Sequence, residues 1–138
     1  MIGASHIFVV KVKKGINWDN ARNACQKKGG DLAVLSTYKT INAIAPFTLF
    51  DGEVGEYWIG AKNPSKQKSN WKWLTGEPIP LSFGGWREGR EKVNAKQPDG
   101  NGDCLAYCNR SGDDATRGIC DWGCTYGAEG YICQIPSK

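Results

Sequence analysis

Residues 104–124 read CLAYCNRSGDDATRGICDWGC, a stretch that holds four of the six cysteines of the chain. In an antiparallel hairpin, residues that face each other have a constant sum of positions, and the pairs 104 with 124 and 108 with 120 share one sum. The two pairs are also an even number of residues apart, so both fall on one face of the hairpin. The spacing therefore favours the bridges Cys104–Cys124 and Cys108–Cys120.

The remaining cysteines are Cys25 and Cys133, whose pairing would tie the beginning of the domain to its end. Zinc sites usually combine Cys-x2-Cys pairs with histidines, but this sequence has no such pair and a single histidine, His6. We therefore expect three disulfides, and with them a secreted, extracellular protein. The sequence begins without a recognisable secretory leader, so we expect that Met1 replaces a removed signal peptide.

The length of 138 residues suits one domain, predicted over residues 1–138 with a core from about 7 to 135. The net charge is only +4 and the basic residues form no stripe among aromatic residues, so nucleic acid is not an expected partner. No apolar run approaches the ~20 residues of a membrane span, so membrane insertion is not expected. With one histidine and all thiols assigned to bridges, we do not expect an enzyme.

Hydrophobic periodicity and capping residues indicate the secondary structure. One helix is predicted from Trp18 to about Lys28 with Asn17 as its cap, and a second one has Ser36 as its cap and ends at Pro46. Antiparallel strands are predicted over 6–12, 57–61, 71–74, 104–107, 119–122 and 131–135. Together these elements predict an α+β domain.

In this order, the elements and their motifs resemble the C-type lectin family. The motifs are Trp18-x-x-Ala21-x-x-x-Cys25, Gly29-Gly30-Asp31-Leu32-Ala33, Trp58-Ile59-Gly60-Ala61, Trp71-Lys72-Trp73, Asn101-Gly102-Asp103-Cys104 and Gly130-Tyr131-Ile132-Cys133. The resemblance implies a double-loop α+β domain with two helices, antiparallel strands and one long loop that carries the ligand site. Cys108 and Cys120 are additional to the common cysteine framework of the family.

The segment 75–103 is rich in glycine, proline and polar residues, and a loop of this length inside a compact domain is usually functional. It contains Gln97-Pro98-Asp99, which matches the triplet that the family places around a cis-proline. Calcium takes six to eight hard oxygen ligands, which amide and carboxylate side chains supply. The resemblance implies a calcium site that also binds galactose-like sugars, although Gln97-Pro98-Asp99-Gly100 taken alone is a good turn sequence.

Three residues are the first candidates for both calcium and carbohydrate: Gln97, Asp99 and Asp121. Asn101 and Asp103 are further candidate metal ligands in a shortened loop. The family pattern is broken at Cys120, where an asparagine is usual, and at Gly102, where a glutamate is frequent. An aromatic residue that stacks on the sugar is also missing at Gly100. Trp122 is the first candidate to replace it, and Trp86 is the second.

Two functions remain open. One is a calcium-dependent galactose-type lectin that acts in recognition, agglutination or innate defence; the other is a calcium-independent domain that binds a protein, a mineral or ice. The oxygen ligands favour the first function, whereas Cys120 and Gly102 favour the second. A homo-oligomer would suit weak sites, because multivalency raises avidity. Asn109-Arg110-Ser111 is a glycosylation sequon and agrees with secretion.

Overall fold

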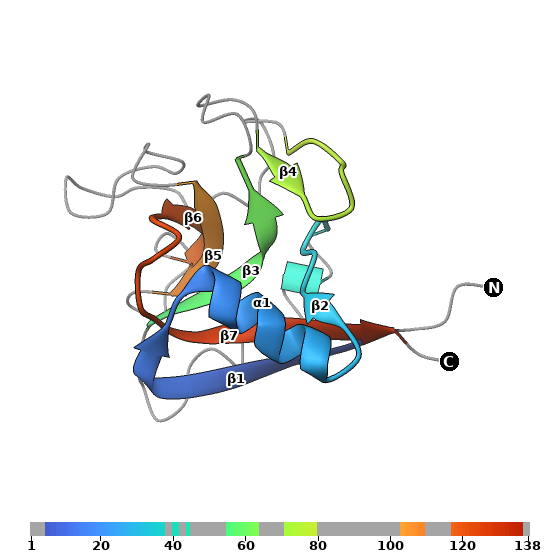
Figure 1. Ribbon diagram of the computed structural model, residues 1–138. Coiled ribbons are helices and arrows are strands. Elements are labelled where there is room, and N and C mark those ends of the chain that lie inside the picture. Colours follow the sequence, from blue (N-terminus) through green and yellow to red (C-terminus); the bar gives the residue numbers. More distant parts are fainter. Residues whose placement is uncertain are drawn as a thin grey trace.

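A computed structural model of the chain describes residues 5–37, 40–41, 44, 55–63, 71–79, 103–109 and 117–136 (Figure 1). The elements in chain order are β1 (Ser5–Ile16), α1 (Trp18–Lys27), β2 (Asp31–Leu32), β3 (Gly55–Lys62), β4 (Lys72–Trp73), β5 (Cys104–Asn109), β6 (Arg117–Trp122) and β7 (Ala128–Pro136). Among the described residues, no helix is both long and apolar enough to cross a membrane.

The strands form one sheet in the order β1-β7-β3-β5-β6, with β2 beside β7 and β4 beside β3. All pairs are antiparallel except β3 with β7, which run parallel. The prediction of purely antiparallel pairing is therefore wrong at this one place. Parallel neighbours need a long connection, and β3 and β7 are separated by most of the second half of the chain.

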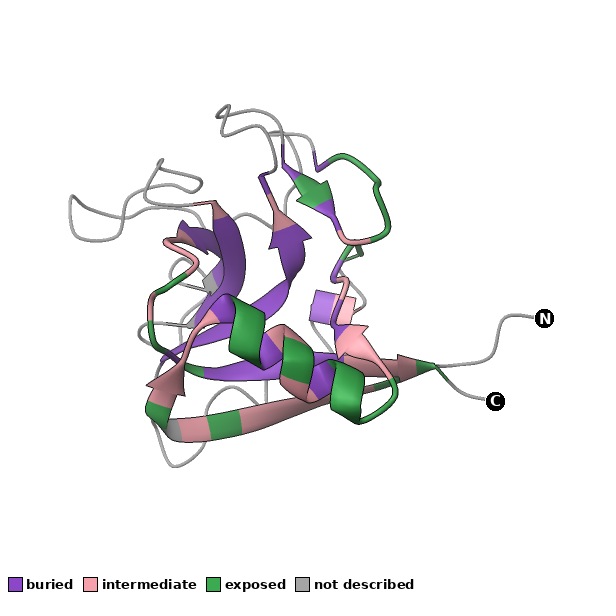
Figure 2. Cartoon of the chain, viewed as in Figure 1, coloured by how far each residue is buried: buried purple, intermediate pink, exposed green. Residues whose placement is uncertain are grey.

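Helix α1 agrees with its prediction at both ends. The side chain of Asn17 accepts a hydrogen bond from the backbone N–H of Asn20 at 2.8 Å, which satisfies one free donor of the first turn. Trp18, Ala21 and Cys25 are buried against the sheet at helical spacing. Figure 2 shows the opposite face of α1 exposed.

The sheet separates two hydrophobic clusters. The first cluster includes Tyr57, Ile59, Leu105 and Ile119, and the second includes Trp58 with the side chains of α1. Successive residues of a strand point to opposite faces, so β3, β5 and β6 each contribute alternate side chains to the two clusters. Both faces of the central strands are buried, as Figure 2 shows.

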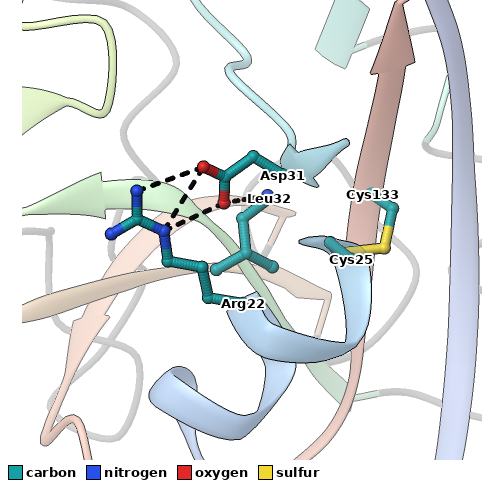
Figure 3. The surroundings of a disulfide bond; sticks show 5 residues. All are labelled: Arg22, Cys25, Asp31, Leu32 and Cys133. Atoms are coloured by element: carbon teal, nitrogen blue, oxygen red, sulfur yellow. Dashed lines mark hydrogen bonds and ion pairs between the residues drawn. A yellow bond between two sulfur atoms is a disulfide. The ribbon is translucent and has the colours of Figure 1, made fainter. Parts of the chain in front are cut away.

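The three predicted disulfides are confirmed as Cys25–Cys133, Cys104–Cys124 and Cys108–Cys120, and the described residues contain no free cysteine. Figure 3 shows the first bridge, which joins the end of α1 to β7. Close to it, Arg22 donates to both carboxylate oxygens of Asp31, with its Nε 3.0 Å from Oδ1. Bridge and ion pair together fasten α1 to β2 and β7.

The register predicted for the cysteine hairpin is wrong by two residues. Cys104 lies opposite Trp122, and Cys108 lies opposite Gly118, so neither bridge joins directly opposed residues. The Cα–Cα distances are 5.1 Å for Cys104–Cys124 and 6.1 Å for Cys108–Cys120, which a disulfide spans on a diagonal. The equal sums of positions therefore predicted the correct cysteine partners but the wrong register of β5 against β6.

The predicted second helix is only partly described. Thr40, Ile41 and Ile44 are helical, and both isoleucines are buried in the first cluster. The residue that caps this turn is Thr37 and not Ser36, because the Thr37 Oγ1 accepts from the backbone N–H of Thr40 and its carbonyl accepts from Ile41. The remainder of this predicted helix lies outside the described residues.

Candidate functional site

Three strand ends meet at one edge of the sheet, next to Asp103, the last residue of the predicted loop 75–103. Lys62 at the end of β3 lies opposite Cys104 at the start of β5, and Cys104 lies opposite Trp122 at the end of β6. The backbone N–H of Asn63 donates to the carbonyl oxygen of Asp103 over 2.9 Å. This hydrogen bond joins the end of β3 to the start of β5. We call the edge formed by the end of β3, the start of β5 and the end of β6 the loop edge.

Asp121 is the candidate ligand that the structure positions most firmly. Its side chain is 1% exposed, and it lies opposite Leu105 in the ladder of β5 and β6. Because Leu105 and Ile119 belong to the first cluster, Asp121 points to the same face of the sheet. A buried carboxylate is stable only with hydrogen bonds or positive charge around it. Asp121 is thus a buried carboxylate near the end of β6.

The two neighbours of Asp121 in β6 point to the other face. Cys120 belongs to the second cluster and is bonded to Cys108, so its sulfur is not a ligand for a cation beside Asp121. Trp122 packs on that second face with its ring stacked on Tyr126, at 4.7 Å between ring centroids and 16° between planes. The structure therefore separates Trp122 from Asp121, which argues against the predicted stacking of Trp122 on a sugar bound there.

The other predicted site residues fall into two groups. Asp103 is described, half-buried, and lies at the loop edge directly before β5. The candidates that lie outside the described residues are Gln97, Asp99, Asn101 and Trp86. Of the predicted ligands, the structure thus brings Asp103 and Asp121 to one edge of the sheet.

Asn63 is a polar residue of the loop edge that the sequence reasoning missed. Its side chain is 6% exposed, although it follows the last residue of β3 and stands at the start of a segment between strands. An asparagine after a strand usually lies in a turn at the surface, where it is exposed. Asn63 departs from this pattern because it is buried. One feature of the sequence could have indicated this burial. Asn63 directly follows β3, a strand that is buried on both faces.

The donor set at the loop edge suits a hard cation. Carboxylate and amide oxygens of Asp121, Asp103 and Asn63 are the ligand types that calcium prefers. Within the described part of the chain, no three His, Cys, Asp or Glu side chains are grouped closely enough to hold a metal ion. The described residues fit calcium in chemistry, and a complete coordination sphere would require donors from the long loop.

A second concave region lies away from the loop edge. It has a volume of about 370 Å³ and lies between β2, the turn after β4 and the end of β7, where Asp31, Leu74 and Gln134 line it. The Asp31 carboxylate already accepts from Arg22 and from the backbone N–H of Leu32, as Figure 3 shows. The region shares no residue with the loop edge and is not part of the candidate site.

Comparison with known proteins decides the family. The lectin C-type domain family matches residues 14–135, which is nearly the whole chain. The chain belongs to the C-type lectin family. Domains of this family are generally binding modules without enzymatic activity, and the helix, mixed sheet and three disulfides described above are one version of the C-type lectin fold.

Relatives extend the comparison. Human C-type lectin domain family 17 member A is 34% identical over 67 residues, which cover 49% of this chain and 17% of that protein. Human C-type lectin domain family 10 member A is 24% identical over 116 residues, 82% of this chain and 34% of that protein. This C-type lectin domain therefore spans between about a sixth and a third of the length of these two relatives.

Solved structures with the same fold include both lectins and antifreeze proteins. A C-type lectin from the tunicate Polyandrocarpa misakiensis has a TM-score of 0.70 at 22% identity, covering 98% of this chain and all of that one. A calcium-independent type II antifreeze protein has a TM-score of 0.68 at 20% identity, covering 100% of this chain and 91% of that one. At these identities the likeness concerns the C-type lectin fold alone.

Proposed function

We propose that this C-type lectin domain binds carbohydrate through calcium, with galactose-type specificity. The observation that supports the proposal is the buried carboxylate of Asp121 near the end of β6, opposite Leu105, which is two residues after Asp103. Asp99 is four residues before Asp103, and each residue spans at most about 3.6 Å, so the Asp99 backbone lies within about 15 Å of Asp103. The Gln97-Pro98-Asp99 segment is therefore tied by the chain to the loop edge.

Each proposed ligand has a distinct part. Gln97 would supply an amide oxygen, and Asp99 and Asp121 would supply one carboxylate each, with Asn101 and Asp103 as further oxygens. Asp99 and Asp121 alone would balance the charge of a divalent cation, and Asp103 would add one further negative charge. A calcium ion held there would offer coordination positions to two neighbouring sugar hydroxyls. The same amide and carboxylate groups would accept hydrogen bonds from those hydroxyls and so orient the sugar.

Trp86 is the aromatic residue that we propose for the apolar face of the sugar. It belongs to the same predicted loop, 75–103, as Gln97 and Asp99, whereas the ring of Trp122 is stacked on Tyr126 on the face of the sheet opposite to Asp121. Galactose presents a continuous patch of C–H groups on one face, which an aromatic ring covers. The proposal thus assigns sugar stacking to the loop and gives Trp122 a packing role.

Retention on a galactose column with and without a calcium chelator tests the proposal. Retention that the chelator abolishes supports it, and a mannose column of equal density is the control for specificity. Retention that the chelator does not affect would exclude the calcium-dependent mechanism. Failure to bind either column would favour the second function.

The second function is calcium-independent binding of a protein, a mineral or ice. The Cys108–Cys120 bridge favours it, because it removes the asparagine oxygen that family members place beside the aspartate at this position. The similar calcium-independent type II antifreeze protein and a herring type II antifreeze protein share the fold. In this case the chain would bind its partner equally well with chelator present.

The three disulfides also support a secreted, extracellular location, because bridges persist in oxidising compartments. One domain over residues 1–138 remains part of the proposal. Non-reducing and reducing gels of the protein isolated from culture medium and from cell lysate test the location. Oxidised protein in the medium is expected, and reduced protein confined to the lysate would contradict it.

A further inference from the structure

The concave region between β2, the turn after β4 and the end of β7 is a pocket that the candidate calcium site does not use. Its volume of about 370 Å³ falls within the roughly 300 to 1,000 Å³ of small-molecule sites. We call it the Asp31 pocket, after the carboxylate in its lining. Its lining includes Asp31, Leu32, Val34, Leu74, Thr75 and Gln134. The size of the pocket suits one small ligand or one side chain of a partner protein.

Hydrogen bonds and close packing hold the walls of the Asp31 pocket in place. The backbone N–H of Leu74 donates to the carbonyl oxygen of Gly60 over 2.8 Å, which fastens the turn after β4 to β3. The backbone N–H of Val34 donates to Oε1 of Gln134 over 3.1 Å. A Cβ on Gly30 would collide with the carbonyl oxygen of Gln134, so the chain before β2 packs directly on β7. The pocket is therefore formed before a ligand arrives, which lowers the entropic cost of binding.

Aliphatic residues from three segments line the Asp31 pocket. Leu32 of β2 is buried, and Val34 and Leu74 are half-buried. Pro136, the last residue of β7, also belongs to the lining. An aliphatic group placed among these residues would remove apolar surface from water on both sides of the contact. The pocket thus suits a ligand with an aliphatic portion.

Asp31 is the one charged residue among the described lining residues. Arg22 donates to its carboxylate from Nε and Nη2, and the backbone N–H of Leu32 donates to Oδ1 over 2.8 Å. These are three N–H groups, whereas a carboxylate offers about four lone-pair positions. Figure 3 shows Arg22 reaching Asp31 from α1, and Arg22 is not part of the pocket lining. With a side chain that is 35% exposed, the oriented carboxylate can accept a further hydrogen bond.

The charge of the lining favours one class of ligand. None of the described lining residues is basic, and the Asp31 carboxylate would repel an anionic group. A protonated amine donates a charge-assisted hydrogen bond to a carboxylate, which is roughly twice as strong as a neutral one. The ion pair of Asp31 with Arg22 is neutral as a whole, so this attraction acts at short range. The structure therefore favours an ammonium group in contact with Asp31 and an aliphatic stem behind it.

We propose that the Asp31 pocket binds a primary ammonium group on a linear aliphatic stem. The ammonium donates to the Asp31 carboxylate, and the stem packs against Leu32, Val34 and Leu74. A free alkylamine and a lysine side chain of a partner protein share this chemistry, since lysine carries its ammonium on a flexible four-carbon stem. The pocket shares no residue with the loop edge, so this binding is independent of calcium and sugar.

Titration of the full chain with n-butylammonium, followed through its amide resonances in NMR spectra, tests the proposal. Butylammonium reproduces the lysine side chain, 1-butanol is the neutral control and butyrate is the anionic control. We expect shifts confined to β2, the turn after β4 and the end of β7, with an affinity about fivefold or more above that of 1-butanol. Equal affinity for the alcohol, tighter binding of butyrate, or no shift in these segments overturns the proposal.

A blocked tripeptide with lysine between two glycines distinguishes the two sources of the ligand. Shifts of the same resonances on addition of the peptide support a lysine side chain of a partner protein as the ligand. Binding of butylammonium without binding of the peptide supports a free alkylamine.

Two variants of the ion pair have opposite expected effects on butylammonium binding. Asp31→Asn keeps the shape of the side chain and removes its charge, so the affinity should fall about tenfold or more. Arg22→Gln leaves the carboxylate without its cationic partner and should retain or raise the affinity. Both substitutions break the same ion pair, so a merely structural role would change the two affinities alike. Equal losses in the two folded variants, or unchanged affinity of a folded Asp31→Asn protein, contradict the proposed site.

A third variant serves if Asp31→Asn does not fold. Thr75 is exposed and lines the pocket, so Thr75→Lys places an ammonium of the protein itself beside it and should lower the affinity for butylammonium about fivefold or more. Asp19→Asn removes a carboxylate from the exposed surface of α1, outside the pocket, and should leave the affinity unchanged. Unchanged binding by a folded Thr75→Lys protein, or an equal loss in Asp19→Asn, contradicts the proposed site.

Discussion

Asp121 and Trp122 are neighbours in the chain, yet their side chains lie on opposite faces of β6. Asp121 is buried on the face of the first cluster, and Trp122 stacks on Tyr126 within the second. The alternation of a regular strand imposes this separation. It assigns the aspartate to the candidate site and the tryptophan to the packing of the sheet against α1.

Replacing Trp122 should therefore affect stability and not binding. Trp122→Ala removes the stacked ring from Tyr126 and should lower the free energy of unfolding by about 2 to 3 kcal/mol, less than for a fully buried tryptophan. Trp122→Phe keeps an aromatic ring and should lower it less. Urea unfolding measures both effects. A Trp122→Ala protein of unchanged stability that loses retention on galactose would show that the tryptophan contacts the sugar after all.

The three disulfides should differ in their contribution to stability. Cys25–Cys133 spans 108 residues and Cys108–Cys120 spans 12, so the chain-entropy model assigns roughly 5 and 3 kcal/mol to them. Replacing the first pair by alanine should then shift the urea midpoint further than replacing the second. All four cysteines are 0 to 1% exposed, so the loss of packing is similar in the two variants. Equal shifts would contradict the loop-length explanation.

Gly60 should not tolerate a side chain. A Cβ at this position would lie 2.6 Å from the carbonyl oxygen of Leu32 and 3.1 Å from that of Ala33, two backbone atoms that cannot move aside easily. Gly60→Ala is expected to lower the free energy of unfolding by about 1 to 3 kcal/mol through overpacking. Gly123→Ala is the control, because no atom lies within 4 Å of its Cβ. Similar stability of the two variants would show that β2 and β3 can separate without cost.

The sequence predicted local features more accurately than pairings between distant segments. Asn17 and the burial of Trp18, Ala21 and Cys25 follow from helical spacing and capping, which depend on residues a few positions apart. The parallel contact of β3 with β7 has no such local signal. It depends on how the intervening chain folds, and the hydrophobic pattern of a strand that is buried on both faces is the same for either direction.

The candidate site rested on the family resemblance, which implied Asp103 and Asp121 as ligands and stays a prediction. The structure places Asp103 directly before β5 and Asp121 opposite Leu105. The predicted strand over 119–122 already implied opposite faces for Asp121 and Trp122, but which face belongs to which cluster follows only from the pairing of β6 with β5. Asn63 was missed because burial of a polar residue after a strand is a property of the tertiary fold.

Asp121→Asn should separate metal binding from folding. The substitution keeps the shape of the side chain and removes one negative charge from the proposed site, so calcium affinity should fall about tenfold or more. Asp19→Asn removes the same charge from the exposed surface of α1 and should leave calcium affinity unchanged. Calorimetric titration with calcium compares the two. Equal affinities of the two variants and the unchanged protein would remove Asp121 from the site.

Calorimetry on the unchanged protein tests the central claim most directly. Calcium is titrated first, then galactose into the calcium-loaded protein, and then galactose in the presence of a chelator. We expect calcium binding with a dissociation constant of ~10⁻⁴ to 10⁻³ M, the range of extracellular modules, and galactose binding that requires calcium. No binding heat with millimolar calcium, together with no response to galactose in its presence, would contradict the lectin function and leave calcium-independent binding of a protein, mineral or ice surface in its place.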